Sequence, residues 1–240
     1  MRRALSVAVV AAVLAPTLLA AQSWRDVTMS RQIEDNREVR VLVEYAAGRL
    51  TVRPTDEGVL YSMNLHYDED RFEPVADFSG DRLRLGVESI GRGFNVGRGK
   101  QSGQLDLELA RGIPMELDLE FGAVRADIDL GGLALTELDL STGASQSTID
   151  ISEPNSAVMS AARFKIGAAE FEARHLGNLN AELIEVDAGV GQVTLDFTGR
   201  WQRDARVSID MGLGALELRI PEGLGVRLTK DGFLVSLDSE

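Results

Sequence analysis

The stretch that decides the fold is LDLEFGAVRADIDL at residues 117–130, in which apolar and polar side chains alternate on both sides of a glycine. The same alternation returns at intervals of 21 to 24 residues around the glycines Gly122, Gly143, Gly167, Gly191 and Gly214. Alternation of this kind is typical of strands with one buried face, and such a repeat is typical of stacked units. The sequence therefore predicts an all-β, single-domain β-solenoid with coils of about 21–24 residues and the five glycines in one column.

The first half of the chain follows the alternation less regularly. Apolar residues alternate through 39–47 up to Gly48, and again through 61–67 and 83–87. Residues 91–103, GRGFNVGRGKQSG, contain five glycines and three basic residues and predict a loop. We therefore expect some antiparallel pairing near the N-terminal end and regular coils after it, with the last strands at 226–228 and 233–237.

The first residues have the layout of an export signal. A basic start, MRR, precedes an apolar run at 4–19 and two alanines, which predicts a secretory signal peptide at residues 1–21. An uncleaved membrane anchor is the alternative, but the run is shorter than the roughly 20 residues of a spanning helix and contains Pro16. Residues 22–37 are polar and predict a linker with at most one irregular strand. The predicted β-solenoid domain covers residues 38–240.

Composition restricts the class of partner. The 240 residues include no cysteine, so neither disulfides nor thiolate chemistry contribute. The formal net charge of −13 at pH 7 opposes binding to nucleic acid or anionic lipid. We expect an exported protein, periplasmic or extracellular, with no stable membrane insertion after signal cleavage, no nucleic-acid partner and no cofactor.

Four runs of the repeat resemble domains of bacterial envelope proteins. They are LDLEFGAVRADIDLGGL (117–133), LDLSTGASQSTIDISEPN (138–155), GNLNAELIEVDAGVGQVTLDFTGRW (177–201) and VSIDMGLGALELRIPEGLGVRL (207–228). They are similar to the toast-rack and LiaF-like C-terminal domains and to the related putative-adhesin β-solenoids, over residues 39–235. The resemblance implies an envelope location and a sensing, scaffolding or adhesion role. This family has no catalytic motif that could be carried over to the chain.

One candidate site is a row of charged residues on the outward face of the predicted coils. Each lies four residues before a glycine, and the row contains Glu44, Asp118, Asp139, Arg163, Asp187 and Asp210. In stacked coils these side chains should form one column, with Arg163 bridging Asp139 and Asp187. Three interpretations remain open. They are a solvated ladder of charges, a Ca²⁺ site, since Ca²⁺ prefers oxygen ligands, and a lyase-like site with Arg163 as base. The candidate Ca²⁺ ligands are Asp118, Asp139, Asp187 and Asp210.

Three further features are candidates for ligand binding. The run GRGKQS at 97–102 lacks a glycine and a hydroxyl residue of the phosphate-loop pattern, although its basic side chains and backbone amides can hold a small anion. His66 and His175 lie far apart, and without cysteine a zinc site would need carboxylates to complete it. Trp201 either covers the flank of the solenoid or offers a stacking platform for a sugar.

No convergent catalytic set follows from these residues. We expect no enzyme but an exported cell-envelope protein that acts as an interaction, scaffolding, adhesion or stress-sensing module. Its partner would be an envelope protein or a polysaccharide. The alternative is a cation-dependent β-helix protein that binds or cleaves polysaccharide, with an activity that depends on Arg163.

Overall fold

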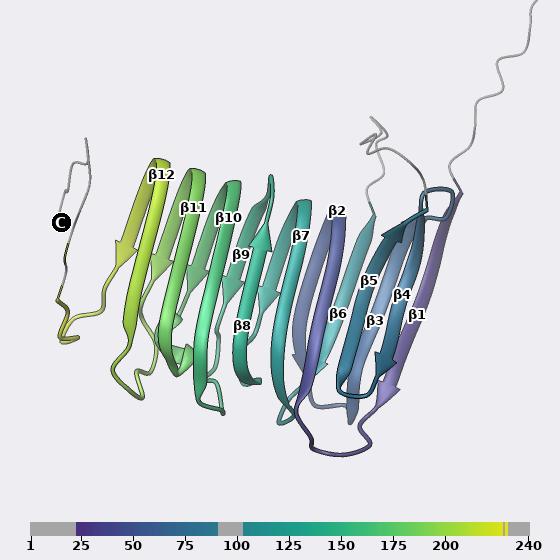
Figure 1. Cartoon of the computed structure of the whole chain (residues 1–240), viewed down its shortest axis with the longest axis horizontal. Coiled ribbons are helices and arrows are strands. Elements are labelled where there is room, and N and C mark those ends of the chain that lie inside the picture. Colours follow the sequence, from purple (N-terminus) through teal and green to yellow (C-terminus); the bar gives the residue numbers. More distant parts are fainter. Residues whose placement is uncertain (1–22, 91–102, 228, 230–240) are drawn as a thin grey trace, which may run out of the picture.

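Two walls of strands face each other across one apolar core. The computed structural model describes residues 23–90, 103–227 and 229. Five long strands fold over at their middle, so that the first half of each lies in one wall and the second half in the other (Figure 1). We call these the front wall, which faces the viewer in Figure 1, and the back wall. The predicted all-β solenoid is confirmed.

The described chain consists almost entirely of strands. Their bounds are β1 Trp24–Gln32, β2 Val39–Thr55, β3 Val59–Asp68, β4 Phe72–Ser79, β5 Arg82–Ser89, β6 Gln104–Ala110, β7 Pro114–Asp129, β8 Ala134–Thr142, β9 Gln146–Asp150, β10 Met159–Arg174, β11 Ala181–Asp196 and β12 Arg206–Arg219. A short 3-10 helix, η1, covers Leu176–Leu179. The folded-over strands are β2, β7, β10, β11 and β12, whereas β8 with β9 forms one coil from two separate strands. In the described residues no helix is long and apolar enough to cross a membrane.

Parallel ladders determine the length of each coil. In the front wall the chain advances by 21 residues from Leu117 to Leu138, by 24 to Ala162, by 22 to Ile184 and by 23 to Val207. The predicted coil length is therefore confirmed. Because the strands pair in register, equivalent side chains stack along the solenoid about 4.8 Å apart. The alternating apolar side chains of both walls meet between them and form the core.

Antiparallel strands form the N-terminal end. β1 pairs with β3, β3 with β6, and β4 with β5, all antiparallel. β2 begins the parallel part, since its front half pairs with β5 through Arg40–Glu44 and its back half with β6 through Arg49–Thr55. Most of the predicted loop at 91–103 lies outside the described residues, as do the predicted signal peptide and the predicted strand at 233–237.

β1 is the one irregular strand that the prediction of a polar linker at residues 22–37 allowed, with a shift of register between Arg31 and Gln32. The strand runs beside β3 from Trp24, opposite Asp68, to Gln32, opposite Val59. It lies at the end of the strand order, and among the described strands only β3 pairs with it. Val27 and Met29 of β1 pack against the core, whereas the other face of the strand is polar and exposed to solvent. Because polar residues predominate in the strand, its composition resembles that of a linker.

Buried asparagines hold the turns that join successive coils. Asn155 donates from Nδ2 to the backbone oxygens of Leu135 at 2.8 Å and Leu179 at 3.2 Å, and its Oδ1 accepts from the backbone nitrogen of Leu135 at 2.8 Å. Asn178 repeats the arrangement by donating to the backbone oxygen of Ile151 at 2.7 Å. Each buried amide thus satisfies backbone groups that water cannot reach and ties one coil to its neighbours.

The predicted single glycine column is wrong, because the glycines form two columns. The first column contains Gly122, Gly143, Gly167, Gly189 and Gly212, each of which lies against the backbone of the preceding member or, for the first, of Ala46. Gly191 and Gly214 belong to a second column two positions later, in register with Ala169. The last two coils carry a Gly-x-Gly sequence, so counting along the chain selects the wrong glycine of each pair.

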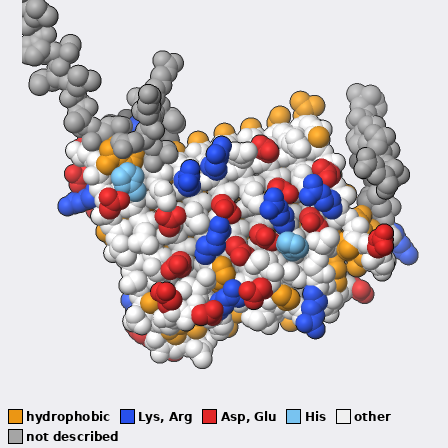
Figure 2. Space-filling model, turned by 180° about the vertical axis from the view of Figure 1, so that it is seen from behind, with side chains coloured by type: hydrophobic (Ala, Val, Ile, Leu, Met, Phe, Trp, Pro, Cys, Tyr) orange, Lys and Arg blue, Asp and Glu red, His pale blue; other side chains and the backbone are white. Residues whose placement is uncertain are grey.

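A row of exposed apolar side chains follows the bend between the two glycine columns. Its members are Ala123, Ala144, Ala168, Val190 and Leu213. Figure 2, a view from behind, shows apolar side chains along the upper edge, above a back wall on which acidic and basic side chains are mixed. The bend is therefore apolar, whereas the outer faces of the walls are charged.

Candidate functional site

The charged residues that the sequence places in one column form two neighbouring columns on the front wall. The first column contains Asp118, Asp139, Arg163 and Glu185 in register. The second column lies two positions nearer the bend and contains Glu44, Glu120, Ser141, Lys165, Asp187 and Asp210. The cause is the same as for the glycines, because counting four residues back from a member of the second glycine column stops two positions short of the first charged column.

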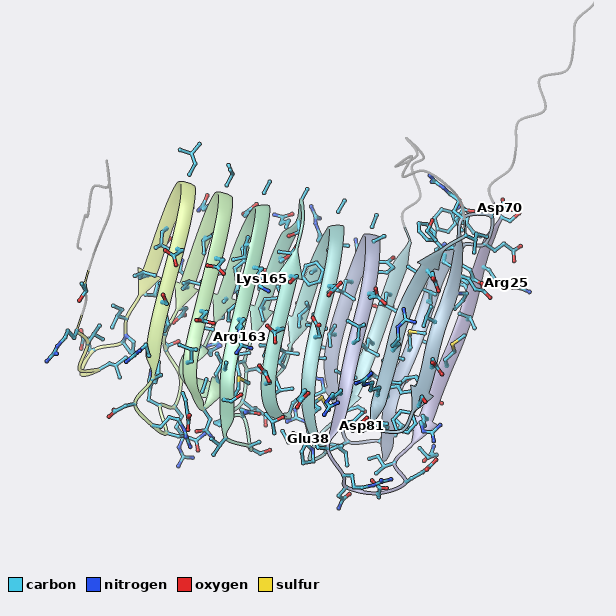
Figure 3. The ribbon with its side chains drawn as sticks, in the orientation of Figure 1. Arg25, Glu38, Asp70, Asp81, Arg163 and Lys165 are labelled. Carbon is cyan, nitrogen blue, oxygen red and sulfur yellow. The ribbon has the colours of Figure 1, made fainter. Side chains whose placement is uncertain are left out.

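Arg163 is the centre of the first column. Its guanidinium contacts Glu137, Asp139 at 3.3 Å and Glu185 at 3.2 Å. The predicted bridge from Asp139 to Asp187 is therefore wrong, because Arg163 pairs in register with Glu185 while Asp187 pairs with Lys165. Figure 3 shows Arg163 and Lys165 on the same strand, β10, with Lys165 closer to the bend.

The surroundings of Arg163 do not suit a general base. The hydrogen bond to Glu137 raises the pKa of Arg163, and the charges of Asp139, Glu137 and Glu185 raise it further against the effect of partial burial. A guanidinium is already fully protonated at neutral pH, so a raised pKa moves it further from accepting a proton. The arrangement instead neutralises a cluster of carboxylates.

The four aspartates predicted as Ca²⁺ ligands form two separate pairs. Asp118 lies opposite Asp139 on neighbouring strands, and Asp187 lies opposite Asp210. In the part of the chain that the structure describes, no group of three or more His, Cys, Asp or Glu side chains could hold a metal ion. Each aspartate pair supplies only two carboxylates, whereas Ca²⁺ takes about 6–8 oxygen ligands.

Asp118 has surroundings that disfavour its charged form. Burial raises its pKa, and the neighbouring carboxylates of Glu120 and Asp139 raise it further. Lys165 opposes this effect from the second column. Repulsion between stacked carboxylates thus persists beside Arg163, because the guanidinium contacts Asp139 but not Asp118.

A groove crosses the front wall beside the bend. It has a volume of about 730 Å³ and extends from β4 and β5 across β2, β7, β8 and β10 to β11. Its floor includes Ala46, Gly122, Gly143 and Gly167, which carry a methyl group or no side chain at all. Because nothing larger stands at these positions, the backbone is open to a ligand that lies across the strands.

The groove is mainly apolar, with charges beside its floor. Phe72 and Val87 line it at the N-terminal end, and the charged lining residues are Glu44, Glu88, Glu120, Lys165 and Asp187. Glu44 is paired with Arg84 at 2.9 Å. The lining therefore contains four carboxylates and one ammonium group, and a ligand that carries positive charge fits it better than an anion.

The sequence alone does not reveal the groove, although the glycines that form its floor are its most regular feature. Their spacing predicts stacking, but a groove also needs neighbouring side chains to stand above the floor. Phe72 and Val87 come from the antiparallel β4–β5 pair, whose position beside β2 is not encoded in the coil repeat.

The two histidines each bind one carboxylate. His66 Nδ1 lies 2.7 Å from Asp26 Oδ1, and its ring stacks on Trp24 at a centroid distance of 4.8 Å. His175 Nδ1 lies 2.6 Å from Asp150 Oδ1. The two histidines therefore take part in separate structural contacts that hold β1 on β3 and one turn of the solenoid.

Trp201 lies at the edge of the apolar core. Its Nε1 donates to the backbone oxygen of Phe197 at 2.9 Å, and the two rings stack at a centroid distance of 6.3 Å. The side chain is partly buried against the core, so it covers the flank of the solenoid. The predicted anion loop at 97–102 lies outside the described residues.

Stacked coils that bend at a glycine, with charged outer faces and an apolar interior, define a class of β-solenoid. The model of the N-terminal domain of toast_rack, DUF2154, matches residues 21–173 and 155–219. The chain therefore belongs to the toast-rack family. No curated protein matches the chain.

Two solved structures match the chain, and the first of them is similar in fold. A "putative cell adhesion protein" from Clostridium sporogenes has a TM-score of 0.57 and 15% sequence identity, and the alignment covers 82% of this chain and 99% of that chain. A "putative adhesin" from Bacteroides fragilis has a TM-score of 0.37 and 10% identity, with 82% and 97% of the two chains covered. The first of these supports the fold, and its low identity carries no functional residue to this chain.

Proposed function

We propose that this protein is an exported cell-envelope protein that acts as a non-enzymatic interaction module. Its binding site is the groove beside the glycine column. Membership of the toast-rack family supports the envelope location, and the similar fold of the C. sporogenes protein described as a cell adhesion protein supports an interaction role. The basic and apolar start of the sequence supports export.

The observation that carries the proposal is the extent of the groove. It passes over strands from β4 and β5 to β11, so an extended polymer can lie across successive coils. Because the strands pair in register, each coil adds an equivalent contact position to the groove, about 4.8 Å from the one before. A preformed groove on paired strands loses little conformational entropy when a partner binds, which suits a module that recognises a linear segment.

Charge supports a cationic or neutral partner. Glu120 and Asp187 line the groove, and within the described residues neither forms an ion pair. The formal net charge of the whole chain is −13, so an anionic polymer would be repelled over a long range at low salt. A basic segment of an envelope protein fits best, and a neutral polysaccharide is the second candidate because carboxylates accept hydrogen bonds from hydroxyl groups.

The non-enzymatic role is supported by the chemistry of the groove and the front wall. Arg163 is held by three carboxylates and is a poor proton acceptor. The charged lining residues of the groove are carboxylates and one lysine, without a nucleophile oriented by a base.

The test is a binding assay with one groove variant and one matched control. Ser141 lines the groove between Glu120 and Lys165, and Ser141→Trp places an indole in it. Thr148→Trp is the control, because Thr148 belongs to the same coil but lies in the back wall. The probes are a decapeptide of alternating Val and Lys, the corresponding Val and Glu peptide, and a neutral β-glucan oligosaccharide.

We expect the basic peptide or the neutral glycan to bind the parent protein and the control, with at least a tenfold loss in Ser141→Trp, about 1.4 kcal/mol. The acidic peptide should not bind. Equal binding by both variants, or binding of none of the probes, would reject the groove as the site. Release of reducing ends from the glycan in the presence of calcium, abolished by Arg163→Ala, would show that the protein is an enzyme.

A further inference from the structure

The lining of the groove differs in chemistry between its two ends. At the β4–β5 end, the apolar side chains of Phe72 and Val87 line the groove and are only partly buried. The other large apolar residues of the lining, Tyr45, Phe121 and Ile166, are at most 5% exposed. A ligand therefore meets accessible apolar surface at the β4–β5 end, and mainly backbone and polar side chains beyond it.

The carboxylates at the apolar end already have a cationic partner. Arg84 donates a hydrogen bond to Glu44 at 2.9 Å. This hydrogen bond raises the pKa of Arg84, and the charges of Glu44 and Glu88 raise it further. Because one guanidinium partly offsets both carboxylates, a basic ligand side chain gains less at this end than it would beside an unpaired carboxylate.

Unpaired charges follow further along the groove. Glu120 on β7 and Asp187 on β11 both line it, and no ion pair among the described residues includes either of them. Lys165 on β10 lies between these two strands, in register with Asp187. The order along the groove is therefore acidic, basic and acidic. A basic ligand side chain fits over Glu120 and over Asp187, whereas Lys165 repels one.

The strand order converts this pattern into a spacing along a ligand. From β5, which carries Val87, the front wall continues through β2, β7, β8 and β10 to β11 (Figure 1). Since neighbouring strands lie about 4.8 Å apart, Glu120 is roughly 10 Å and Asp187 roughly 24 Å from the apolar end. An extended peptide advances about 3.3 Å per residue, so these distances correspond to about three and about seven residues.

We propose that the groove binds an extended peptide segment with an apolar anchor, a basic residue about three positions from the anchor and a second basic residue about seven positions from it. The anchor packs on Phe72 and Val87, the basic residues lie over Glu120 and Asp187, and the residues over Lys165 are uncharged. This inference rests on the proposed function, because it takes the groove as the binding site, and it adds which segment the groove selects. The flexible stem of a lysine tolerates a shift of about one position.

The first test compares two octapeptides of one composition, each with one phenylalanine, two lysines and otherwise serine. The ordered peptide has phenylalanine first and lysines fourth and eighth, whereas the permuted peptide has lysines first and eighth and phenylalanine fourth. Both have acetylated and amidated ends, which removes the terminal charges. Non-specific attraction to the acidic protein is then equal for the two. In calorimetric titrations of the full chain, we expect the ordered peptide to bind about tenfold more tightly, because a buried anchor dominates binding.

The second test assigns the two ends of the peptide with matched variants. Phe72→Ala removes the surface that the anchor contacts, and Phe78→Ala is its control, because Phe78 lies on the same strand and is also partly buried against the core but does not line the groove. Asp187→Asn removes the distal charge. Its control is Asp210→Asn, since Asp210 lies in register with Asp187 on β12 but does not line the groove. We expect each groove variant to weaken binding of the ordered peptide at least about threefold and the controls to leave it unchanged.

The outcomes separate this inference from the proposed function. Equal affinities for the two peptides, both lowered by Ser141→Trp, would overturn the proposed order of anchor and charges and leave the groove as the binding site. Equal losses in Phe72→Ala and Phe78→Ala would overturn the anchor, because a loosened β4 would then explain both. Failure of both peptides to bind would overturn the inference as well, while the β-glucan oligosaccharide decides separately whether the groove binds a neutral glycan.

Discussion

Gly191→Ala tests the second glycine column directly. Gly191 has a φ of +146°, and a Cβ built there would lie 1.9 Å from the backbone oxygen of Ala169 and 2.9 Å from its carbonyl carbon. Real Cβ contacts essentially never fall below 3.0 Å, so β10 and β11 would have to separate locally by about 1.1 Å at this pair. The backbone conformation costs about 1–3 kcal/mol for a residue with a side chain, and each ladder hydrogen bond lost adds about 1 kcal/mol.

The expected free-energy loss for Gly191→Ala is therefore about 2–5 kcal/mol, from backbone strain and one or two broken hydrogen bonds. For a chain of this size the melting temperature should fall by roughly 4–20 °C. Gly143→Ala is the matched control in the first column. A Cβ there would meet no atom closer than 3.4 Å, an ordinary contact, and its φ is not positive. We expect a change of less than about 1 kcal/mol of either sign.

The assay is thermal unfolding followed by far-UV circular dichroism, with urea unfolding to obtain the free energy at 25 °C. Equal losses in the two variants would refute the wider spacing of the backbones at Gly143. An unchanged melting temperature in Gly191→Ala would refute the close approach of β10 and β11 at this point.

Three further predictions concern charge and buried polar groups. The raised pKa of Asp118 means that the folded state binds a proton more tightly than the unfolded state, so its contribution lowers stability as the pH rises from about 4 through the folded pKa. Asp118→Asn should then raise the melting temperature at pH 7 by roughly 1–4 °C and have little effect at pH 3. Calcium, magnesium and sodium chlorides at equal ionic strength should shift the melting temperature equally through screening, and a calcium-only shift that Asp139→Asn abolishes would contradict this. Asn155→Leu should lower stability by about 2–4 kcal/mol in urea unfolding, because backbone groups of neighbouring coils lose their partner. An unchanged midpoint would mean that Asn155 does not hold the turns.

The coils could be predicted from the sequence because the residues that define each coil lie close together in the chain. The alternation in LDLEFGAVRADIDL and the turn residues that follow it set strand length and facing without reference to other strands. Column membership depends instead on the register between strands. In the GVG of β11 both glycines satisfy the local pattern, and only the pairing of Gly191 with Ala169 decides between them.

The candidate site was less predictable for the same reason. Arg163 lies at the expected position beside Asp139, but its second partner is Glu185, which a count from Gly191 misses by two positions. The groove combines glycines of the repeat with Phe72 and Val87, and no sequence periodicity connects these two parts. β1 likewise depends on a distant partner, β3, that its polar composition does not indicate.

The register has a consequence for the kinetics of folding. Neighbouring strands in the C-terminal half are separated by only 22 residues from Met159 to Ala181, whereas β2 meets β7 after 76 residues, from Val39 to Met115. The entropy of closing the longer loop costs about 1 kcal/mol more. Folding should therefore nucleate in the C-terminal coils and spread backwards, opposite to the order of synthesis.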